Sequence, residues 1–179
     1  MIKYFHNNKT LSFVLVSTLV FILYITLILS HVSGCFTIEV GSNSLGLSFY
    51  YTKDMVQNFF DLRSQEQLLC YSKFLKIWDV IFAFVYTLMY ASWIAFFIKN
   101  KRIFLIIPIL AMICDWAENY IEILMLDIYL KSKLIPDTYV LLGSTTNSFK
   151  WILSTLTYFV ILYGIIIVII KYIKKPKVN

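Results

Sequence analysis

Residues 103–126 read IFLIIPILAMICDWAENYIEILML, an apolar run that nevertheless contains three carboxylates. The run is long enough to cross a bilayer as a helix, since a hydrocarbon core of about 30 Å needs roughly 20 residues. At 100° per residue, Asp115, Glu118, Asn119 and Glu122 share one face of that helix. A carboxylate that faces lipid costs roughly 3 kcal/mol near the middle of a span, so we expect this face to meet protein or water.

The rest of the chain also has the composition of a membrane protein. Of its 179 residues, 60% are hydrophobic and only 15% are charged, and the mean hydropathy is +0.76. A soluble fold of this length would have too little polar surface to cover that apolar content, and a disordered chain would be poor in Leu, Ile and Phe. Three more runs qualify as spans, at residues 11–30, 74–98 and 151–173. The sequence therefore predicts an all-α integral membrane four-helix bundle, a single membrane domain over residues 1–179.

Polar residues recur along the other three spans as well. Asp79, Tyr86 and Tyr90 align on one face of the second span, and Lys150 opens the fourth. The same faces carry Ala83 and Trp93 in the second span, Asn147, Ser154, Thr157 and Gly164 in the fourth, and Ser17, Tyr24 and His31 in the first. We therefore expect one shared polar interior. Its predicted binding cluster is Asp79, Asp115, Glu118, Asn119, Glu122, Lys150, Tyr86 and Tyr90.

The acids of this cluster outnumber the cations that could reach them. Lys150 is the nearest candidate, and Lys76 and His31 are further ones. Buried like charges at short range cannot all stay ionised, so we expect a bound proton or a neutralising cation among the acids. Two interpretations stay open: a fixed hydrogen-bond network that holds the helices in register, or a site for a cation, a proton or a polar ligand group.

Lysine and arginine predict the orientation of the spans. They precede the first span, join the second to the third, and follow the fourth (Lys3, Lys9, Lys99, Lys101, Arg102, Lys171, Lys174, Lys175, Lys177). Such residues are retained on the cytoplasmic side. We therefore expect a bacterial inner-membrane protein with both termini in the cytoplasm and loops 31–73 and 127–149 outside. The net charge of +6 is explained by anionic lipid at the membrane edge and requires no nucleic-acid partner.

The outer segment 31–73 contains further signals. From Tyr51 onward, apolar residues recur at near-helical spacing, which indicates an amphipathic helix that acts either as a lid or as plain interfacial packing. Cys35 and Cys70 fall on the same, oxidising side and are a disulfide candidate. Alternatively, residues 32–35 (VSGC) resemble a bacterial lipobox that follows a signal peptide, in which case Cys35 would carry lipid. Cys114 lies in mid-span, where it would pack as a small apolar residue.

Several of these residues together resemble a family of small bacterial four-span membrane proteins. The resemblance covers about residues 45–165 and consists of an aromatic-rich segment, a span with an early Asp and a later Tyr, a span with D-x-x-E-N, and a span that opens with Lys-Trp. The corresponding residues are Tyr71, Asp79, Tyr86, Asp115, Glu118, Asn119, Lys150 and Trp151. The resemblance implies a four-span fold and no particular activity.

Motif absences narrow the chemistry. The sequence has no P-loop, GxGxxG, GxSxG or HExxH, and its two histidines lie on opposite sides of the membrane, so we expect no cofactor and no resident metal. Three functions remain. In the first, the protein binds or passes a small cation or proton, alone, as a homo-oligomer or with a membrane partner. In the second, it is an enzyme or binder of an amphiphile, with Asp79, Glu118 or Glu122 as acid or base. In the third, it is an accessory protein that stabilises a membrane complex. A hydrated path would favour the first, an apolar cavity beside the acids the second, and a dry, fully paired seam the third.

Overall fold

The computed structural model describes residues 8–38, 44–98 and 102–173, and these ranges are helical with no strand. Four helices are long and apolar enough to cross a membrane: Thr10–Cys35, Gln65–Phe97, Ile103–Ser132 and Asp137–Lys171. The predicted all-α class is therefore confirmed, and the chain has the helices of a multi-pass membrane protein.

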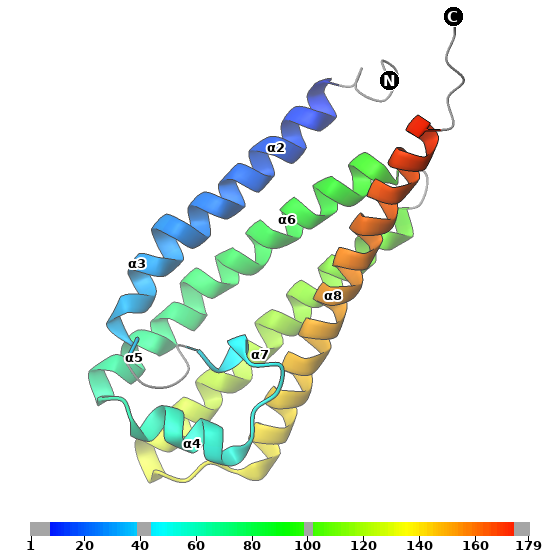
Figure 1. The fold of residues 1–179 in the computed structure, drawn as a ribbon. Helices are drawn as coiled ribbons and strands as arrows, with labels where there is room; N and C mark the ends of the chain where they lie inside the picture. The colour runs from blue at the N-terminus through cyan, green and yellow to red at the C-terminus, as the bar shows by residue number, and fades with distance from the viewer. Residues whose placement is uncertain (1–7, 39–43, 99–101, 174–179) are drawn as a thin grey trace, which may run out of the picture.

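The spans divide into shorter elements, of which the longest are α2 (Asn8–Leu23), α6 (Val80–Phe97), α7 (Ile106–Ser132) and α8 (Asp137–Ile173). Helices α7 and α8 form an antiparallel hairpin, α6 packs against both, and α2 packs mainly against α6 (Figure 1). The start of α2 and the end of α8 lie at one end of the bundle, which we call the terminal end. Polar side chains join α2 to α6, since the hydroxyls of Ser17 and Ser92 are hydrogen-bonded over 2.8 Å.

The α7–α8 hairpin extends further than the sequence predicted. Residues 127–149 were expected to form an outer loop, but α7 continues to Ser132 and α8 begins at Asp137, so only residues 133–136 form the turn. Lys133 ends α7 in the left-handed conformation, with φ of 59°. The prediction was wrong because it followed hydropathy alone: this stretch of mixed polarity is helical, and Tyr129, Ile135 and Val140 pack in a core with other protein elements. With 37 residues, α8 is about 55 Å long and exceeds the hydrocarbon core.

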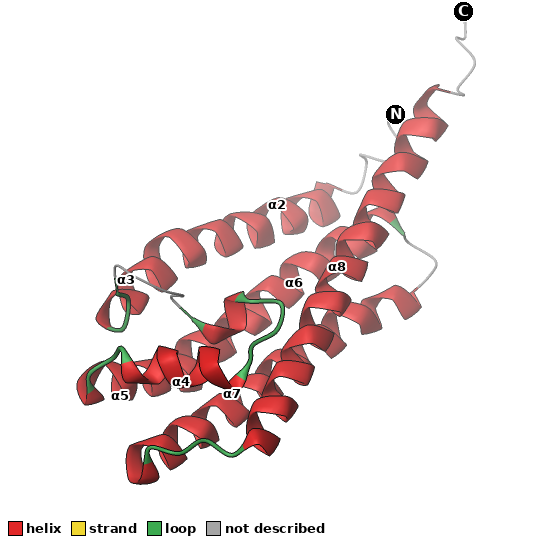
Figure 2. Cartoon of the chain, turned by 60° about the horizontal axis from the view of Figure 1, so that its bottom comes forward, coloured by secondary structure: helices red, strands yellow, loops and turns green. Residues whose placement is uncertain are grey.

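A compact head covers the other end of the bundle, which we call the disulfide end. It contains α4 (Lys53–Asp61), α5 (Gln65–Lys73) and the facing ends of α7 and α8 (Figure 2). Thr52 caps α4, and Ser64 and Gln67 form a capping box on α5. The apolar face of α4 is buried against protein, in a core that comprises Phe36, Leu45, Tyr51, Val56, Phe59, Phe60, Leu68, Tyr71, Phe74, Leu75, Met125, Leu126, Tyr129, Ile135 and Val140. The expected amphipathic helix is thus two short helices that pack on the bundle.

A disulfide between Cys35 and Cys70 closes the base of this head, with their Cα atoms 6.3 Å apart. A lipobox cysteine carries a lipid on its sulfur through a thioether, and a sulfur in a disulfide cannot also carry that lipid. In this structure Cys35 is therefore a disulfide partner and not a lipidated residue. Beside the disulfide, the buried Arg63 donates to the carbonyl oxygens of Phe36 (2.9 Å) and Phe59 (2.8 Å). Burial lowers the pKa of the Arg63 guanidinium below its ordinary value.

Two π-helical segments interrupt the first and second spans at the same level. They are η1 (Tyr24–Leu29) and η4 (Phe74–Asp79). The hydroxyl of Tyr24 donates to the carbonyl oxygen of Trp78 over 2.8 Å and joins the two segments. Such segments are frequent at functional sites because they change the direction of side chains within a helix. Here η4 ends at Asp79, one of the predicted site residues.

Candidate intramembrane binding site

Lys150, on α8, occupies the centre of the acidic cluster. Its ammonium nitrogen Nζ lies 2.5 Å from Oε2 of Glu118 and 3.2 Å from Oδ1 of Asp115, both on α7. The same nitrogen donates to the carbonyl oxygen of Gly46 over 3.2 Å. The side chains are 12% exposed for Lys150, 6% for Asp115 and 0% for Glu118, so little water competes with these ion pairs. The ammonium group of Lys150 therefore neutralises part of the acidic face. Removing one partner of a buried ion pair lowers the stability of a protein by about 3–5 kcal/mol.

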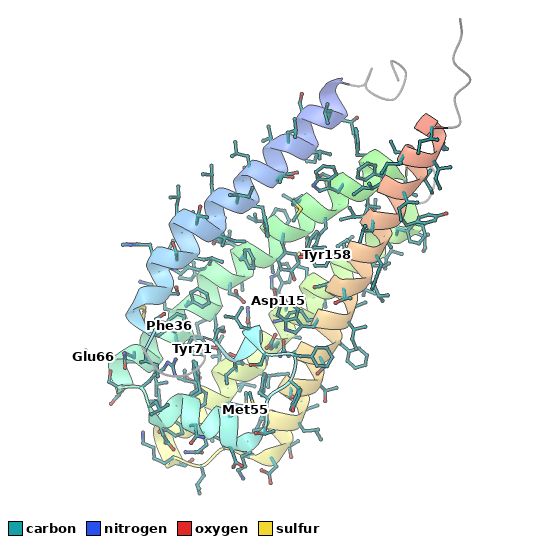
Figure 3. The ribbon with its side chains drawn as sticks, in the orientation of Figure 1. Phe36, Met55, Glu66, Tyr71, Asp115 and Tyr158 are labelled. Atoms are coloured by element: carbon teal, nitrogen blue, oxygen red, sulfur yellow. A yellow bond between two sulfur atoms is a disulfide. The ribbon has the colours of Figure 1, made fainter. Side chains whose placement is uncertain are left out.

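Two hydrogen bonds tie the second span to the third. The hydroxyl of Tyr86 donates to Oδ2 of Asp115 over 3.0 Å, and Nδ2 of Asn119 donates to Oδ2 of Asp79 over 2.8 Å. The second span thus supplies an acceptor at the end of η4 and a donor two turns later on α6, and α7 supplies their partners one turn apart. The hydroxyl of Tyr90 bonds to that of Tyr158 over 2.6 Å instead of to an acid. Figure 3 shows Asp115 in the middle of the bundle and Tyr158 nearer the terminal end.

Glu122 forms the end of the cluster nearest the head. The hydroxyl of Tyr71, on α5, donates to its Oε2 over 2.5 Å. Glu118 and Glu122 lie one turn apart on α7, and their carboxyl groups are close enough to interact. No donor reaches the Oε1 atom of either residue in the described part of the chain. Because two carboxylates can only accept, a proton shared between the two groups is the arrangement that satisfies both.

Two more buried groups beside this pair have an unsatisfied polar atom, the hydroxyl of Tyr51 and Oδ1 of Asn147. Asn147 lies on α8 between Gly143 and Lys150, one turn from each. Tyr51 contacts Gly143, and Lys150 contacts Glu118. Burial and the negative charges of Glu122 and Glu118 raise the pKa of Tyr51 above its ordinary value. The hydroxyl of Tyr51 therefore remains protonated and available as a donor beside the acid pair.

Residues 44–51 form a strap that closes the cluster toward the disulfide end. Five hydrogen bonds join this strap to α8: from Asn147 to the oxygen of Ser48, from Ser148 to that of Phe49, from Lys150 and Trp151 to that of Gly46, and from the nitrogen of Tyr51 to Ser144. A Cβ atom at Gly46 would lie 3.1 Å from Oε1 of Glu118 and 3.2 Å from Nζ of Lys150. The backbone of the strap therefore lies directly on the ion pair.

A cavity of about 450 Å³ lies beside the cluster. Its polar side includes Asp79, Asp115 and Lys150, and its remaining wall is mainly apolar and aromatic: Phe21, Ile25, Leu29, Leu47, Phe74, Phe82, Tyr86, Tyr90, Trp151 and Tyr158. Ile25 is 37% exposed and Tyr158 52%, and these two residues line the cavity from the first and the fourth span. Leu47 of the strap lines the cavity too and is 66% exposed, so the exposed part of the lining comes from the first span, the fourth span and the strap.

The structure brings the eight predicted site residues together in three groups. Tyr86, Asp115, Lys150 and Glu118 are joined by hydrogen bonds and ion pairs, with Glu122 beside Glu118. Asp79 and Asn119 form a separate pair, and Tyr90 bonds to Tyr158 on the cavity wall. His31 and Lys76, considered as counter-charges, are exposed, and neither forms an ion pair with the acids in the described part of the chain. The sequence interpretation missed Gly46, Tyr51, Asn147 and Tyr158 as site residues. It assigned Tyr71 and Trp151 only to the family likeness. The strap contacts Lys150 through the backbone carbonyl of Gly46, and a backbone contact cannot be recognised from residue types. The one signal in the sequence is the glycine itself, which permits close approach of the backbone.

The position that a bound cation would need between the carboxylates is taken by the ammonium group of Lys150. Within residues 8–38, 44–98 and 102–173, no group of three or more His, Cys, Asp or Glu side chains is arranged to hold a metal ion.

No family model, no curated protein and no solved structure matches this chain.

Proposed function

We propose that this protein binds an amphiphile from the bilayer. The hydrocarbon part of the ligand lies between the first and fourth spans, and its head group reaches the polar face formed by Asp79, Asp115 and Asn119. The observation that carries the proposal is the cavity itself: a space of about 450 Å³ with a few polar groups, mainly apolar walls, and exposed lining residues on the first and fourth spans. Ligand sites have this composition, with mostly apolar walls and a few convergent polar groups.

The geometry favours this function over the two others that the sequence left open. A protein whose acids served only to hold the helices together would have a dry, paired seam, whereas here Asp79 and Asp115 border open space. A cation carrier would need carboxylates free of an internal cation, but Lys150 binds two of them. Apolar walls also disfavour a hydrated path for ions, since an ion needs polar groups along its route.

Proton binding is a second candidate, and one observation favours it. The contact between Glu118 and Glu122, with an unsatisfied oxygen on each and the unsatisfied Tyr51 hydroxyl nearby, is a place where a proton can be held. This pair does not line the cavity. A proton held there would act on the ligand site through Glu118 and Lys150, which are paired with each other.

We place the protein in a bacterial inner membrane with both termini in the cytoplasm, so that the head lies on the oxidising side. The disulfide supports this side, because disulfides persist in oxidising compartments. The exposed apolar surface of the spans is the surface that contacts bilayer lipid. Association with a second copy or a membrane partner stays a prediction.

The test of the proposed function fills the cavity. Ser154 lines the cavity on α8, and Ile166 lies on the same helix, 49% exposed and outside the cavity lining. We expect the unaltered protein and the control Ile166→Trp to retain an amphiphile through purification in a mild nonionic detergent, as detected by mass spectrometry of extracted lipid. Ser154→Trp should lose it while keeping its helical circular dichroism. Equal retention by both variants, or none in the unaltered protein, would contradict the proposal.

A further inference from the structure

The charged donor at the cavity is already fully used. An ammonium group has three N–H donors. Nζ of Lys150 has three acceptors within reach: Oδ1 of Asp115, Oε2 of Glu118 and the carbonyl oxygen of Gly46. A head group that needs a charged donor, such as a carboxylate or a phosphate, would have to break one of these contacts.

Asp79 has the opposite character. It lines the cavity and is only partly buried, and its Oδ2 accepts from Asn119. Its Oδ1 receives no hydrogen bond from any residue that the structure describes. By contrast, both oxygens of Asp115 are engaged, one by Lys150 and one by Tyr86. Among the described residues of the cavity lining, Asp79 therefore presents the one carboxylate oxygen that has no hydrogen-bond or ion-pair partner.

The charges of the lining point in the same direction. Two carboxylates, Asp79 and Asp115, face the cavity together with one ammonium, Lys150, which is also paired with Glu118. The described lining is thus negative when these groups are ionised, and low polarity in a bundle interior strengthens that charge. The rings of Phe82 and Tyr86 line the cavity as well, and aromatic faces attract cations. An anionic head group would be repelled, and a cationic one would be attracted.

We infer that the amphiphile of the proposed site carries a protonated amine, whose N–H donates to the free oxygen of Asp79 in the cavity between the first and fourth spans. This inference rests on the proposed function, because it assigns the head group of the same ligand. Asp79 recognises the amine, while Lys150 and Asp115 hold each other and keep the base of the cavity in place.

Three photoreactive probes with the same chain test the inference: diazirine analogues of dodecylamine, dodecanol and dodecanoic acid. The protein is reconstituted in phosphatidylcholine nanodiscs, and the adducts are mapped by mass spectrometry. The variant is Asp79→Asn. The matched control is Asp127→Asn, which changes an exposed acid on α7. We expect the amine probe to label cavity residues such as Phe82 and Tyr158 about tenfold more than the other two probes, the factor that one charge-assisted hydrogen bond brings. The preference should persist in Asp127→Asn and disappear in Asp79→Asn.

The outcomes separate the head group from the cavity. Equal labelling of cavity residues by all three probes, or an undiminished amine preference in Asp79→Asn, overturns the amine assignment and leaves the amphiphile site in place. Labelling of cavity residues no higher than that of lipid-facing Ile166 by any probe overturns the proposed function too. If Asp79→Asn does not accumulate, the comparison of the three probes on the unaltered protein still decides the head group.

Discussion

The carbonyl oxygen of Gly46 accepts a hydrogen bond from the ammonium group of Lys150 over 3.2 Å, so that a loop backbone closes a buried ion pair. The approach depends on the missing side chain, because a Cβ atom at Gly46 would meet Lys150 Nζ at 3.2 Å and Glu118 Oε1 at 3.1 Å. The strap and the acidic cluster are therefore one structural unit.

Gly46→Val should destabilise the protein by about 1–3 kcal/mol, the usual cost of overpacking a filled interior. The two methyl groups would push the strap off α8 and expose the pair of Lys150 and Glu118. Thermal unfolding followed by circular dichroism measures the loss. Gly34→Val is the control, since a Cβ atom at Gly34 meets nothing within 4 Å. Equal melting temperatures for both variants would contradict the close contact.

Lys150→Met should cost about 3–5 kcal/mol, because it leaves Asp115 and Glu118 buried without their cation. Adding Glu118→Gln to Lys150→Met should recover part of that loss, since the second change removes one uncompensated charge. A double-mutant cycle measured by chemical unfolding gives the coupling between the two residues. Lys131→Met on the exposed surface of α7 is the control and should change stability by less than about 0.5 kcal/mol. Additive effects of the two changes would show that the pair is not coupled.

Glu122→Gln should preserve the fold, because glutamine resembles the protonated carboxyl group, keeps an acceptor for Tyr71 and offers a donor to Glu118. Glu122→Leu should destabilise the protein by about 1–3 kcal/mol, because the hydroxyl of Tyr71 loses its acceptor. Infrared spectroscopy of the unaltered protein should contain a protonated carboxyl band that Glu122→Gln or Glu118→Gln removes. If the band is absent, the two acids do not share a proton.

Reduction of the disulfide between Cys35 and Cys70 should loosen the head and leave the bundle folded. The two residues are 35 positions apart, and opening a loop of that size costs about 4 kcal/mol in the chain-entropy account. Hydrogen exchange should increase in α4 and α5, while α6, α7 and α8 keep their protection. Cys114→Ser is the control, because Cys114 is free. Loss of protection throughout the spans would mean that the bundle depends on the disulfide.

The membrane orientation can be checked by single cysteines at Asn100 and Ser42 in a cysteine-free background. We expect an impermeant maleimide to label Ser42→Cys from outside intact cells and Asn100→Cys only after permeabilisation, as the positive-inside rule requires. Both positions lie outside the residues that the structure describes. Labelling of Asn100→Cys from outside would reverse the orientation, and would put the head in the cytoplasm.

The sequence by itself determined the four spans and the polar face of α7. Both are local properties: the length of an apolar run decides whether it can cross a bilayer, and the helical repeat places Asp115, Glu118 and Glu122 on one side. The cost of exposing these acids to lipid then required an inward face, and all three are buried. Their common side of the membrane made Cys35 and Cys70 a disulfide candidate and no more, and the structure pairs them, with their Cα atoms 6.3 Å apart.

Only the tertiary structure decided how that polar face is used. Sequence spacing left open whether Lys150, Lys76 or His31 would neutralise the acids, because that choice depends on how α7 and α8 are rotated against each other. The length of α8 was missed because residues 144–150 are mostly polar, whereas in the structure Asn147, Ser148 and Lys150 are hydrogen-bonded to the strap within a continuous helix. The strap at Gly46 acts through a backbone carbonyl, which every residue has. The cavity between Ile25 and Tyr158 exists because α2 packs mainly against α6, a consequence of packing between distant segments that no local pattern encodes.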